Sequence, residues 1–461
     1  MRLSASALAQ VTGGTLVGQD VPFGGISIDS RRVAAGDLFV AIVGERHDAH
    51  EFLPQAMANA VVGLVSRADL TPPAGKALVV VPDTVAALQA LGRHVRDTLS
   101  LTVVGITGSV GKTTTKELTA AVLSRRFRTA RSSGNFNNAI GLPLEVARLA
   151  EGTEVAVLEM GMSTPGEIRL LSQLFRPDVG VVTAVAPVHL QNFASLDDIM
   201  EAKGEILAGM PAAATFVANA DDPRSMAIGK RHRGALLTYG FARGADVTAT
   251  DLAEDGGAAT FVLHAGDEGA AVELPLPGRH NVSNFLAAAA VGLALGVSAD
   301  EAAAAARRVQ AARHRGEVRR LASGVLLYDD SYNSSPTALA ASYAAFERAA
   351  RGRRKVAVIG EMLELGPTAA ELHRQAGKQL AKRFDLLLAV RGHAAALAEG
   401  AREGGGPEEA VRLLKDVDEA IAVVPPLLAS GDALFVKGSR GVALDRLVDA
   451  LTVGDANGES R

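Results

Sequence analysis

The chain has 461 residues, of which 48% are hydrophobic and 21% charged, so it is long enough for two to four globular domains. Its formal net charge of −4 provides no basic surplus, which argues against a nucleic-acid partner. The sequence contains no cysteine, which excludes disulfides, thiolate catalysis and cysteine-ligated zinc and is compatible with a reducing cytoplasm. The apolar runs are too short for a signal peptide or a bilayer span, so we expect no membrane insertion.

The predicted elements form three successive groups. Residues 1–84 contain short strand-like runs separated by glycine turns, and a helical pattern follows at 84–99. From "LTVVGI" at 101–106, apolar strands alternate with helices, which is typical of a doubly wound parallel sheet. Glycine-rich, β-prone runs at 240–278 predict an antiparallel insertion or edge, and helices are expected at 282–296 and 299–312.

A third α/β unit begins after these helices. Its predicted strands are "GVLLYDDS", "RKVAVIGEM", "FDLLLAVRG" and "DALFVKGS". We therefore predict an α/β fold with three α/β domains, of which the N-terminal one is small and the central one has a mostly parallel sheet. The predicted domain ranges are 1–84, 85–313 and 314–461.

The stretch "GITGSVGKTTTKE" at 105–117 has the features of a phosphate-binding loop. Glycines let backbone N–H groups turn toward an anion, Lys112 adds positive charge, and Thr113 offers a hydroxyl to Mg²⁺. The standard P-loop pattern would need glycine at Ile106, so an ordinary glycine-rich turn is the alternative. The predicted nucleotide-binding residues in this loop are Thr107, Gly108, Ser109, Val110, Gly111, Lys112, Thr113 and Thr114.

Three further residues are candidates for metal binding and catalysis, together with Lys112 and Thr113. Glu159 ends a predicted parallel strand and could hold Mg²⁺, although a solvent-facing or capping glutamate is the alternative. His189 follows the next strand, where an ordinary loop or core histidine is the alternative. Lys203 lies on the helix after it, where a lysine is normally exposed.

Polar loops follow predicted strands in the central and C-terminal parts. "GNFNNAIGLPLEV" contains Asn137 and Asn138, which could donate to phosphate or substrate oxygens or could simply form a turn and helix cap. "YDDSYNSSP" contains Asn333, and "KGSRG" contains Lys437 and Arg440. Because ligand clefts occur at domain interfaces, the recurrence of these loops indicates a site assembled from several domains.

These motifs together resemble the Mur ligase family over nearly the whole chain. The resemblance rests on "TGSVGKTTTKE", "GNFNNAIGLPL", "LEMGMSTPGEI", "PVHLQNF", "AKGEI", "GRHNVSNFLAAAAV", "HRGEV", "DDSYNSSP", "GEMLELG" and "VKGSRG". The family's own loop, TG-x-x-GKT, accounts for the position of the glycines. The resemblance implies ATP and Mg²⁺ as cofactors. It also implies three domains: a first domain that binds a UDP-linked substrate, a central P-loop ATPase domain and a Rossmann-like C-terminal domain.

The resemblance also implies roles for individual residues. It assigns magnesium binding to Thr113, Glu159 and His189, and it adds to this metal site Lys203, which matches a lysine that some members carry carbamylated. It assigns ATP contacts to Lys112 at the phosphates, to Asn281 and Asn284 at the adenine, and to Arg315 and Asp330, which close on the phosphates and ribose. Ser30 and Arg31 would contact the uridine nucleotide, and the remaining substrate contacts would come from Asn137, Asn138, Asn333, Lys437 and Arg440. The sequence departs from the family's usual residues at Ala49, Glu361 and "SSP" (334–336), and none of these departures removes a group that the chemistry needs.

Within the family, "GNFNN", "EMGM", "DDSYN" and "GEMLELG" most resemble the enzyme that adds D-alanyl-D-alanine to UDP-N-acetylmuramoyl-tripeptide in peptidoglycan biosynthesis. The resemblance implies a cytoplasmic, monomeric ATP-dependent ligase that forms an acyl phosphate. The alternatives are another amide ligase of the family, such as one adding diaminopimelate or lysine, a folylpolyglutamate synthase, or a P-loop nucleotide switch. The sequence leaves open the third residue of the accepted tripeptide.

Overall fold

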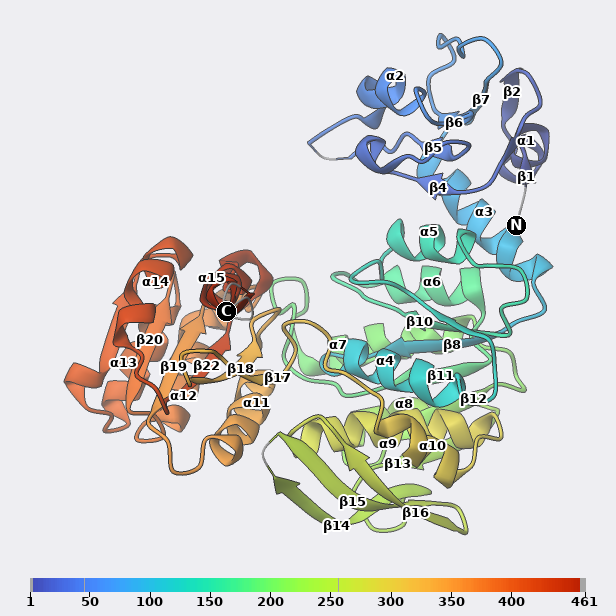
Figure 1. Ribbon diagram of the computed structural model, residues 1–461. Coiled ribbons are helices and arrows are strands. Elements are labelled where there is room, and N and C mark those ends of the chain that lie inside the picture. The colour runs from blue at the N-terminus through green and yellow to red at the C-terminus, as the bar shows by residue number, and fades with distance from the viewer. Residues whose placement is uncertain (1–2, 45, 256, 457–461) are drawn as a thin grey trace. The chain divides into compact units, whose positions relative to one another are not determined.

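The computed structural model describes residues 3–44, 46–255 and 257–456 (Figure 1). Backbone contacts divide the chain into two compact units. Unit 1 contains 1–107, 126–180 and 205–215, and unit 2 contains 108–125, 181–204 and 216–461. The predicted domain boundaries after residues 84 and 313 stay a prediction.

The N-terminal part is built on a five-stranded sheet in the order β2-β7-β6-β5-β4, beside a two-stranded β1-β3 pair. The elements here are β1 (Leu3–Ser4), α1 (Ala5–Thr12), β2 (Thr15–Gly18), β3 (Pro22–Phe23), β4 (Ile26–Ser27), η1 (Ser30–Arg32), β5 (Leu38–Val40), η2 (Ala49–Phe52), α2 (Leu53–Ala56), β6 (Val62–Val65), β7 (Ala77–Val80) and α3 (Thr84–Thr98). Strands β5 and β6 are buried at every position, as expected for parallel strands covered on both faces. The carboxylate of Asp83 caps α3 by accepting from the N–H groups of Val85 and Ala86.

The central sheet has nine strands among the described residues, in the order β16-β15-β14-β13-β12-β11-β8-β10-β9. These strands are β8 (Thr102–Thr107), β9 (Thr129–Arg131), β10 (Val155–Glu159), β11 (Val179–Val182), β12 (Thr215–Asn219), β13 (Ala235–Tyr239), β14 (Val247–Asp255), β15 (Ala258–Ala265) and β16 (Glu268–Leu274). β10 pairs in parallel with β8 and β9, whereas β15 pairs antiparallel with β14 and β16. Both the parallel arrangement and the antiparallel segment at 240–278 are therefore confirmed.

The central helices are α4 (Lys112–Leu123), α5 (Gly141–Ala147), α6 (Glu167–Phe175), α7 (Leu196–Gly204), η3 (Glu205–Ala208), α8 (Pro223–Gly229), α9 (Arg279–Ala294) and α10 (Ala299–Ala306). A capping box of Ser298 and Glu301 begins α10 at its predicted position. The predicted end at residue 312 is wrong, because the helix stops at Ala306. The N–H groups of Arg308 and Val309 bond carbonyls three residues back, which closes turns instead of continuing the helix.

The C-terminal sheet has the order β17-β18-β22-β19-β20-β21. Its elements are β17 (Glu317–Arg320), β18 (Leu326–Asp330), α11 (Pro336–Ala349), β19 (Lys355–Gly360), η4 (Gly366–Thr368), α12 (Ala369–Leu380), β20 (Leu386–Val390), α13 (Ala394–Glu403), η5 (Glu408–Ala410), β21 (Val411–Leu414), α14 (Val417–Val423), η6 (Pro425–Leu427), β22 (Ala433–Lys437), η7 (Arg440–Val442) and α15 (Asp445–Ala456). β17 is antiparallel to β18, and the strand pairs β18–β22, β22–β19, β19–β20 and β20–β21 are parallel. This arrangement confirms the predicted α/β fold of the last part.

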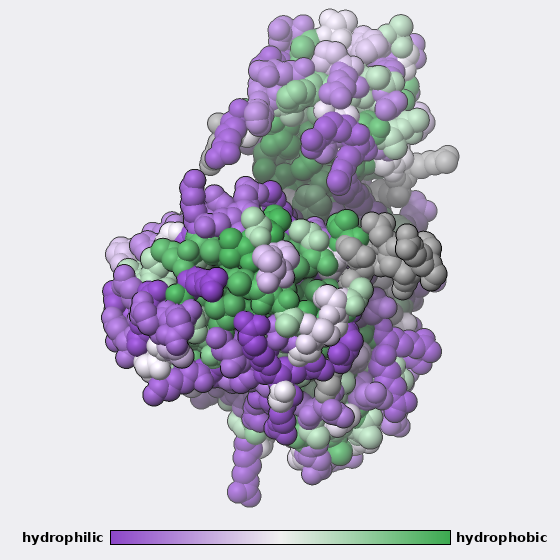
Figure 2. All heavy atoms as spheres, turned by 60° about the vertical axis from the view of Figure 1, so that its left-hand side comes forward, coloured by the Kyte–Doolittle hydropathy of each residue, from purple (hydrophilic) through white to green (hydrophobic). Residues whose placement is uncertain are grey.

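The surface is mainly polar but carries apolar areas. Figure 2 shows a hydrophobic area enclosed by hydrophilic residues on the face that it presents. The most exposed large hydrophobic side chains of the described chain are Val43, Leu413 and Val453. Within the described ranges, no helix is long and apolar enough to cross a membrane.

Candidate functional site

The glycine loop between β8 and α4 has the backbone shape that its sequence predicts. Gly108 and Gly111 have positive φ values of 144° and 83°, which side chains rarely tolerate. A Cβ atom at Gly108 would lie 1.9 Å from Oγ1 of Thr183, so only glycine fits there. Thr107 is fully buried at the end of β8, and α4 begins at Lys112 directly after the loop.

The loop is held by the segment that follows β11. The backbone N–H of Ser109 donates to Ala184 O at 2.7 Å, and its hydroxyl donates to Ala186 O at 2.9 Å. Thr183 Oγ1 donates to Val110 O at 2.6 Å. The N–H and hydroxyl of Ser109 therefore support the loop internally in this conformation, and its predicted nucleotide contact is untested.

Two lysines lie close together in this part of unit 2. Lys112 Nζ donates to Gly108 O at 2.7 Å, so its side chain folds over the loop. Lys203, at the end of α7, has only 1% of its surface exposed, although a lysine on a helix is normally exposed. Burial, and next the positive charge of Lys112, lower the pKa of the Lys203 amine well below its usual range. The structure thus places a buried, weakly basic amine within electrostatic reach of the loop lysine.

Helix α9 brings the predicted adenine residues to the same loop. Thr115 Oγ1 donates to Asn284 Oδ1 at 3.3 Å, and Asn284 Nδ2 donates to Asn281 Oδ1 at 3.4 Å. A Cβ atom at Gly111 would lie 2.4 Å from Asn284 Oδ1, which shows how closely α9 approaches. Thr113 is buried and Thr114 is partly exposed in the first turn of α4.

Glu159 lies in unit 1 with the two predicted asparagines. Its side chain is buried rather than solvent-facing, and Oε1 accepts from Asn137 Nδ2 at 2.9 Å. Asn138 Oδ1 accepts from the N–H groups of Ile140 and Gly141, which is the capping arrangement that its sequence context allows. Asn137 and Glu159 are thus brought together, whereas the Asn138 side chain caps α5.

His189 occupies a left-handed backbone conformation with φ of 55°, which is uncommon for residues other than glycine. Its Nδ1 lies 2.5 Å from Oε2 of Glu364. The hydrogen bond from His189, and its charge when protonated, lower the pKa of the Glu364 carboxyl below its ordinary value, against the opposing effect of burial.

Three predicted residues meet where β18 and β22 end. Asp330 and Lys437 are register partners in the two parallel strands, and Lys437 Nζ lies 2.5 Å from Asp330 Oδ2. The same amine donates to Asn333 O at 3.0 Å, and Ser342 Oγ donates to Asp330 Oδ2 at 2.6 Å. The amine of Lys437 is thus matched by a carboxylate, as expected for a lysine that is only 3% exposed.

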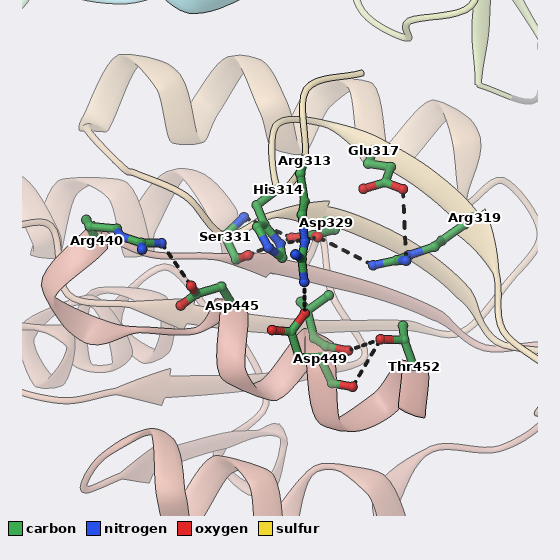
Figure 3. Close-up of polar contacts among 11 residues, drawn as sticks. Arg313, His314, Glu317, Arg319, Asp329, Ser331, Arg440, Asp445, Asp449 and Thr452 are labelled. Carbon is green, nitrogen blue, oxygen red and sulfur yellow. Dashed lines mark hydrogen bonds and ion pairs between the residues drawn. The ribbon is translucent and has the colours of Figure 1, made fainter. Parts of the chain in front are cut away.

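Two predicted arginines flank one aromatic ring. The guanidinium carbon of Arg315 lies 4.1 Å from the centroid of Tyr332, and that of Arg440 lies 5.3 Å from it. Arg440 also donates to Asp445 at 2.8 Å (Figure 3). Arg315 and Arg440 are far apart in the sequence, and the structure brings both to the same tyrosine.

The residue before Arg315 is anchored deep in the C-terminal core. His314 Nδ1 lies 2.8 Å from Asp329 Oδ2, and the fully buried Asp329 also accepts from Ser331 Oγ at 2.6 Å (Figure 3). The N–H of Tyr332 donates to His314 O at 3.1 Å. These bonds fix the backbone on both sides of the Arg315–Tyr332 contact.

The predicted uridine-contact residues lie on η1, in unit 1. Ser30 Oγ donates to Gln55 Oε1 at 3.2 Å. Arg31 donates through Nε and NH2 to the two carboxylate oxygens of Asp29, each at 2.9 Å. This hydrogen bonding lowers the pKa of Asp29 to about 2. Arg31 is nevertheless 79% exposed at its side chain, so its fork is accessible to solvent.

Sequence reasoning overlooked Tyr332 and Glu364 as individual residues. Both lie inside quoted motifs, "DDSYNSSP" and "GEMLELG", but neither is recognisable without its spatial partner. Glu361, one of the departures from the family pattern, accepts from the N–H of His393 at 3.0 Å, immediately before α13. Its carboxylate therefore anchors the residue that precedes α13.

A glycine loop joining a buried strand to a helix that begins with lysine defines a P-loop nucleotide-binding protein. Comparison with known proteins narrows this class. Residues 106–292 match the model of the Mur ligase middle domain, and residues 314–440 match that of the Mur ligase glutamate ligase domain.

Full-length relatives support the same assignment. UDP-N-acetylmuramoyl-tripeptide–D-alanyl-D-alanine ligase from Bacillus subtilis is 33% identical over 96% of this chain and 97% of its own length. A crystal structure of MurF from Acinetobacter baumannii superposes with a TM-score of 0.88 at 32% identity, covering 98% of this chain and 99% of that one. MurF ligase from Thermotoga maritima, in complex with ADP, gives 0.81 at 30% identity over 94% and 98%. The chain belongs to the Mur ligase family.

Proposed function

We propose that this protein is an ATP-dependent ligase that joins D-alanyl-D-alanine to UDP-N-acetylmuramoyl-tripeptide and releases ADP and phosphate. The observation that carries the proposal is the Lys112 loop in a chain that matches UDP-N-acetylmuramoyl-tripeptide–D-alanyl-D-alanine ligases over nearly its whole length. An isolated loop would support only nucleotide binding. The full-length match supports the use of that nucleotide for peptide-bond formation.

The chemistry requires an activated carboxylate, because amide formation in water is uphill. A carboxylate oxygen of the tripeptide attacks the γ-phosphorus of ATP, and the bond from phosphorus to the β,γ-bridging oxygen breaks to release ADP. The dipeptide amine then attacks the acyl phosphate, loses a proton and expels phosphate. Lys112 would stabilise charge on the transferring phosphoryl group, and Arg315 would add a second cation after docking of the C-terminal part.

We propose Mg²⁺ as the metal cofactor, held by Thr113, Glu159 and His189. No group of three or more His, Cys, Asp and Glu residues able to hold a metal is present in the described part of the chain. A metal ion would therefore need a hydroxyl and nucleotide oxygens as ligands in addition to the carboxylate and imidazole of the protein. The buried oxygen donors Thr113 and Glu159 fit such an ion chemically. When bound, Mg²⁺ would neutralise phosphate charge and hold the phosphates in line for transfer.

We further propose that Lys203 carries a carbamate in the active protein. A neutral amine is the form that adds CO₂, and burial together with the charge of Lys112 shifts Lys203 toward that form by lowering its pKa. Carbamylation would convert the buried amine into an anion beside the positive Lys112. Intact-protein mass spectrometry under bicarbonate should show one added CO₂ in the wild type and none in Lys203→Ala.

The remaining assignments complete the proposal. Ser30 and Arg31 would contact the uridine nucleotide; Asn137, Asn138, Asn333, Lys437 and Arg440 the peptide substrates; and the loop residues with Asn281, Asn284, Arg315 and Asp330 the ATP. We propose that the protein works as a monomer in the cytoplasm and without a nucleic-acid partner. The three-domain division at residues 84 and 313 remains part of this proposal.

The direct experiment is incubation with ATP, Mg²⁺, the UDP-linked tripeptide and D-alanyl-D-alanine. Mass spectrometry should detect the joined pentapeptide product, and phosphate release should require both peptide substrates. Product formed with a different amino acid but not with the dipeptide would identify another ligase of the family. Phosphate release that ignores both peptides would support a nucleotide switch.

A further inference from the structure

The segment that carries His189 is docked on a loop of the C-terminal part, within unit 2. His189 Nδ1 is buried and has no hydrogen-bond partner among the described residues besides the Glu364 carboxylate, 2.5 Å away. The backbone follows the side chains, because Gln191 N donates to Glu364 O at 3.3 Å. Two short segments far apart in sequence are therefore joined through side chain and main chain.

The close fit of these segments depends on special backbone positions. Glu364 has φ of 66° and Gly366 has φ of 58°. A Cβ atom at Gly366 would lie 3.0 Å from Leu190 O, so a larger residue would push the two segments apart. Left-handed conformations at non-glycine residues cost free energy and persist where the surroundings impose them. His189 also has a positive φ, so both partners of the ion pair adopt the left-handed conformation.

Apolar packing reinforces the contact. Leu190, the neighbour of His189, packs against the buried C-terminal cluster that contains Met362 and Leu365. Met362 and Leu365, which lie on either side of Glu364 in the sequence, therefore belong to the core that Leu190 contacts. An isolated exposed ion pair contributes little, but a pair fixed by packing and a main-chain bond holds its two side chains in one geometry.

The chemistry of imidazole gives this geometry a consequence. A carboxylate that accepts the Nδ1–H of a neutral histidine leaves the lone pair on Nε2, the nitrogen then free to bind a metal. Carboxylates that act in this way fix both the tautomer and the ring orientation of metal-binding histidines. Among the described residues, the Glu364 carboxylate is the one that forms an ion pair with Nδ1 and could act in this way.

We propose that Glu364 is a positioning residue, which sets the tautomer and orientation of His189 and makes its metal affinity depend on docking of the 364–366 loop. This inference rests on the proposed metal role of His189. It gives the "GEMLELG" loop a function in metal binding although none of its residues is expected to touch the ion. It also explains why the 189–191 segment packs on a C-terminal loop instead of extending freely.

The test compares full-length wild type with Glu364→Ala, Glu364→Gln and His189→Ala, in the presence of ADP. Mn²⁺ serves as the probe, and its affinity is measured by electron paramagnetic resonance of the free ion. We expect Glu364→Ala to bind Mn²⁺ about 10-fold more weakly or worse. Glu364→Gln should lose less, because its amide oxygen can still accept the Nδ1–H. Glu371→Ala, an exposed glutamate on α12 of the same part, should bind as wild type does.

A second measurement follows the tautomer without metal. Nitrogen-15 labelling of the ten histidines, with His189→Ala to assign the signal, should show an Nδ1–H tautomer at His189 that Glu364→Ala converts to a mixture. Wild-type Mn²⁺ affinity and an unchanged His189 signal in folded Glu364→Ala would overturn the inference while leaving the ligase proposal intact. Unchanged Mn²⁺ affinity in His189→Ala would overturn the metal role of His189, and the inference with it.

Discussion

Lys203 in the central part and Lys437 in the C-terminal part are both almost completely buried, yet they have opposite electrostatic surroundings. Lys437 is paired with Asp330 at 2.5 Å and donates to a backbone carbonyl. Lys203 instead experiences burial and the positive charge of Lys112, both of which lower its pKa. Exposure is 3% for Lys437 and 1% for Lys203, so burial does not distinguish them.

The charged partner, rather than the degree of burial, decides what a buried lysine can do. A paired ammonium group has its charge balanced by the carboxylate, and the pair joins two strand ends. A lysine without that compensation is driven toward the neutral amine, which is nucleophilic and open to modification. Groups with strongly shifted pKa values concentrate at functional sites, which supports the proposal that Lys203 takes part in the chemistry.

The largest expected effect comes from the loop lysine beside Lys203. Lys112→Ala should reduce ligation by about 10³-fold, because a cation on the transferring phosphoryl group is lost. The melting temperature should change little, since Lys112 is partly exposed. Lys378→Ala, an exposed lysine that pairs with Glu403, is the matched control. Ligation near the wild-type rate in Lys112→Ala would remove this residue from the mechanism.

Lys203→Ala should lower ligation by about 10²-fold, typical of losing one group that stabilises charge. If the lost group is a carbamate, added formate or acetate should recover part of the activity by occupying the vacated space. The same additions should leave Lys112→Ala unchanged. Failure of every small carboxylate to raise the rate would indicate that Lys203 has a structural role.

The free energy of unfolding should also distinguish the two buried lysines, but here the larger loss is expected at the Lys437–Asp330 pair. Asp330→Asn leaves the ammonium group of Lys437 buried without its carboxylate, so we expect a loss of about 3 kcal/mol in unfolding free energy. Lys203→Met removes a buried polar amine and should be neutral or stabilising. Urea unfolding of both variants measures this contrast. Equal destabilisation of the two would show that their surroundings differ less than the structure indicates.

The smallest effect concerns acid stability. Burial lowers the pKa of His280 from 6.5 to about 4, and burial also lowers the pKa of His373. Between these pH values the unfolded chain binds a proton that folded His280 does not, so unfolding free energy falls as pH drops from 6.5 toward 4. The contribution of His280 is about 2 kcal/mol, reduced from the full shift because the residue keeps part of its surface exposed.

His280→Asn should flatten this pH dependence, whereas His47→Asn, at an exposed position, should not. Denaturant unfolding at a series of pH values provides the comparison. A slope that is unchanged in His280→Asn would mean that other groups control the loss of stability in acid.

Local sequence patterns predicted the alternating strands and the glycine loop well, because period, turn residues and charge there are set by near neighbours. Helix α10 shows the limit: its start carries a capping box, but its alanine-rich sequence does not reveal that the chain turns after Ala306. Hydrophobic pattern sets which face is buried, while tertiary contacts decide where such a helix stops.

The residues of the candidate site were harder to predict from local sequence patterns. Lys203 looked like an ordinary surface lysine, since nothing within four residues shows its burial. Glu364 and His189 are 175 positions apart in numbering, so their contact follows from the fold and not from either motif. Roles for these residues came from family resemblance or from the structure, and pattern alone supplied only the strand ends that carry them.

Activation of a carboxylate by the phosphate loop, instead of the timing of a switch, is the step on which the proposed function depends. It is tested most directly with UDP-N-acetylmuramoyl-tripeptide labelled with oxygen-18 in its terminal carboxylate, in a complete reaction containing D-alanyl-D-alanine. Attack by that carboxylate on the γ-phosphorus predicts one labelled oxygen in each phosphate released. Unlabelled phosphate, with its new oxygen taken from water, would contradict the account.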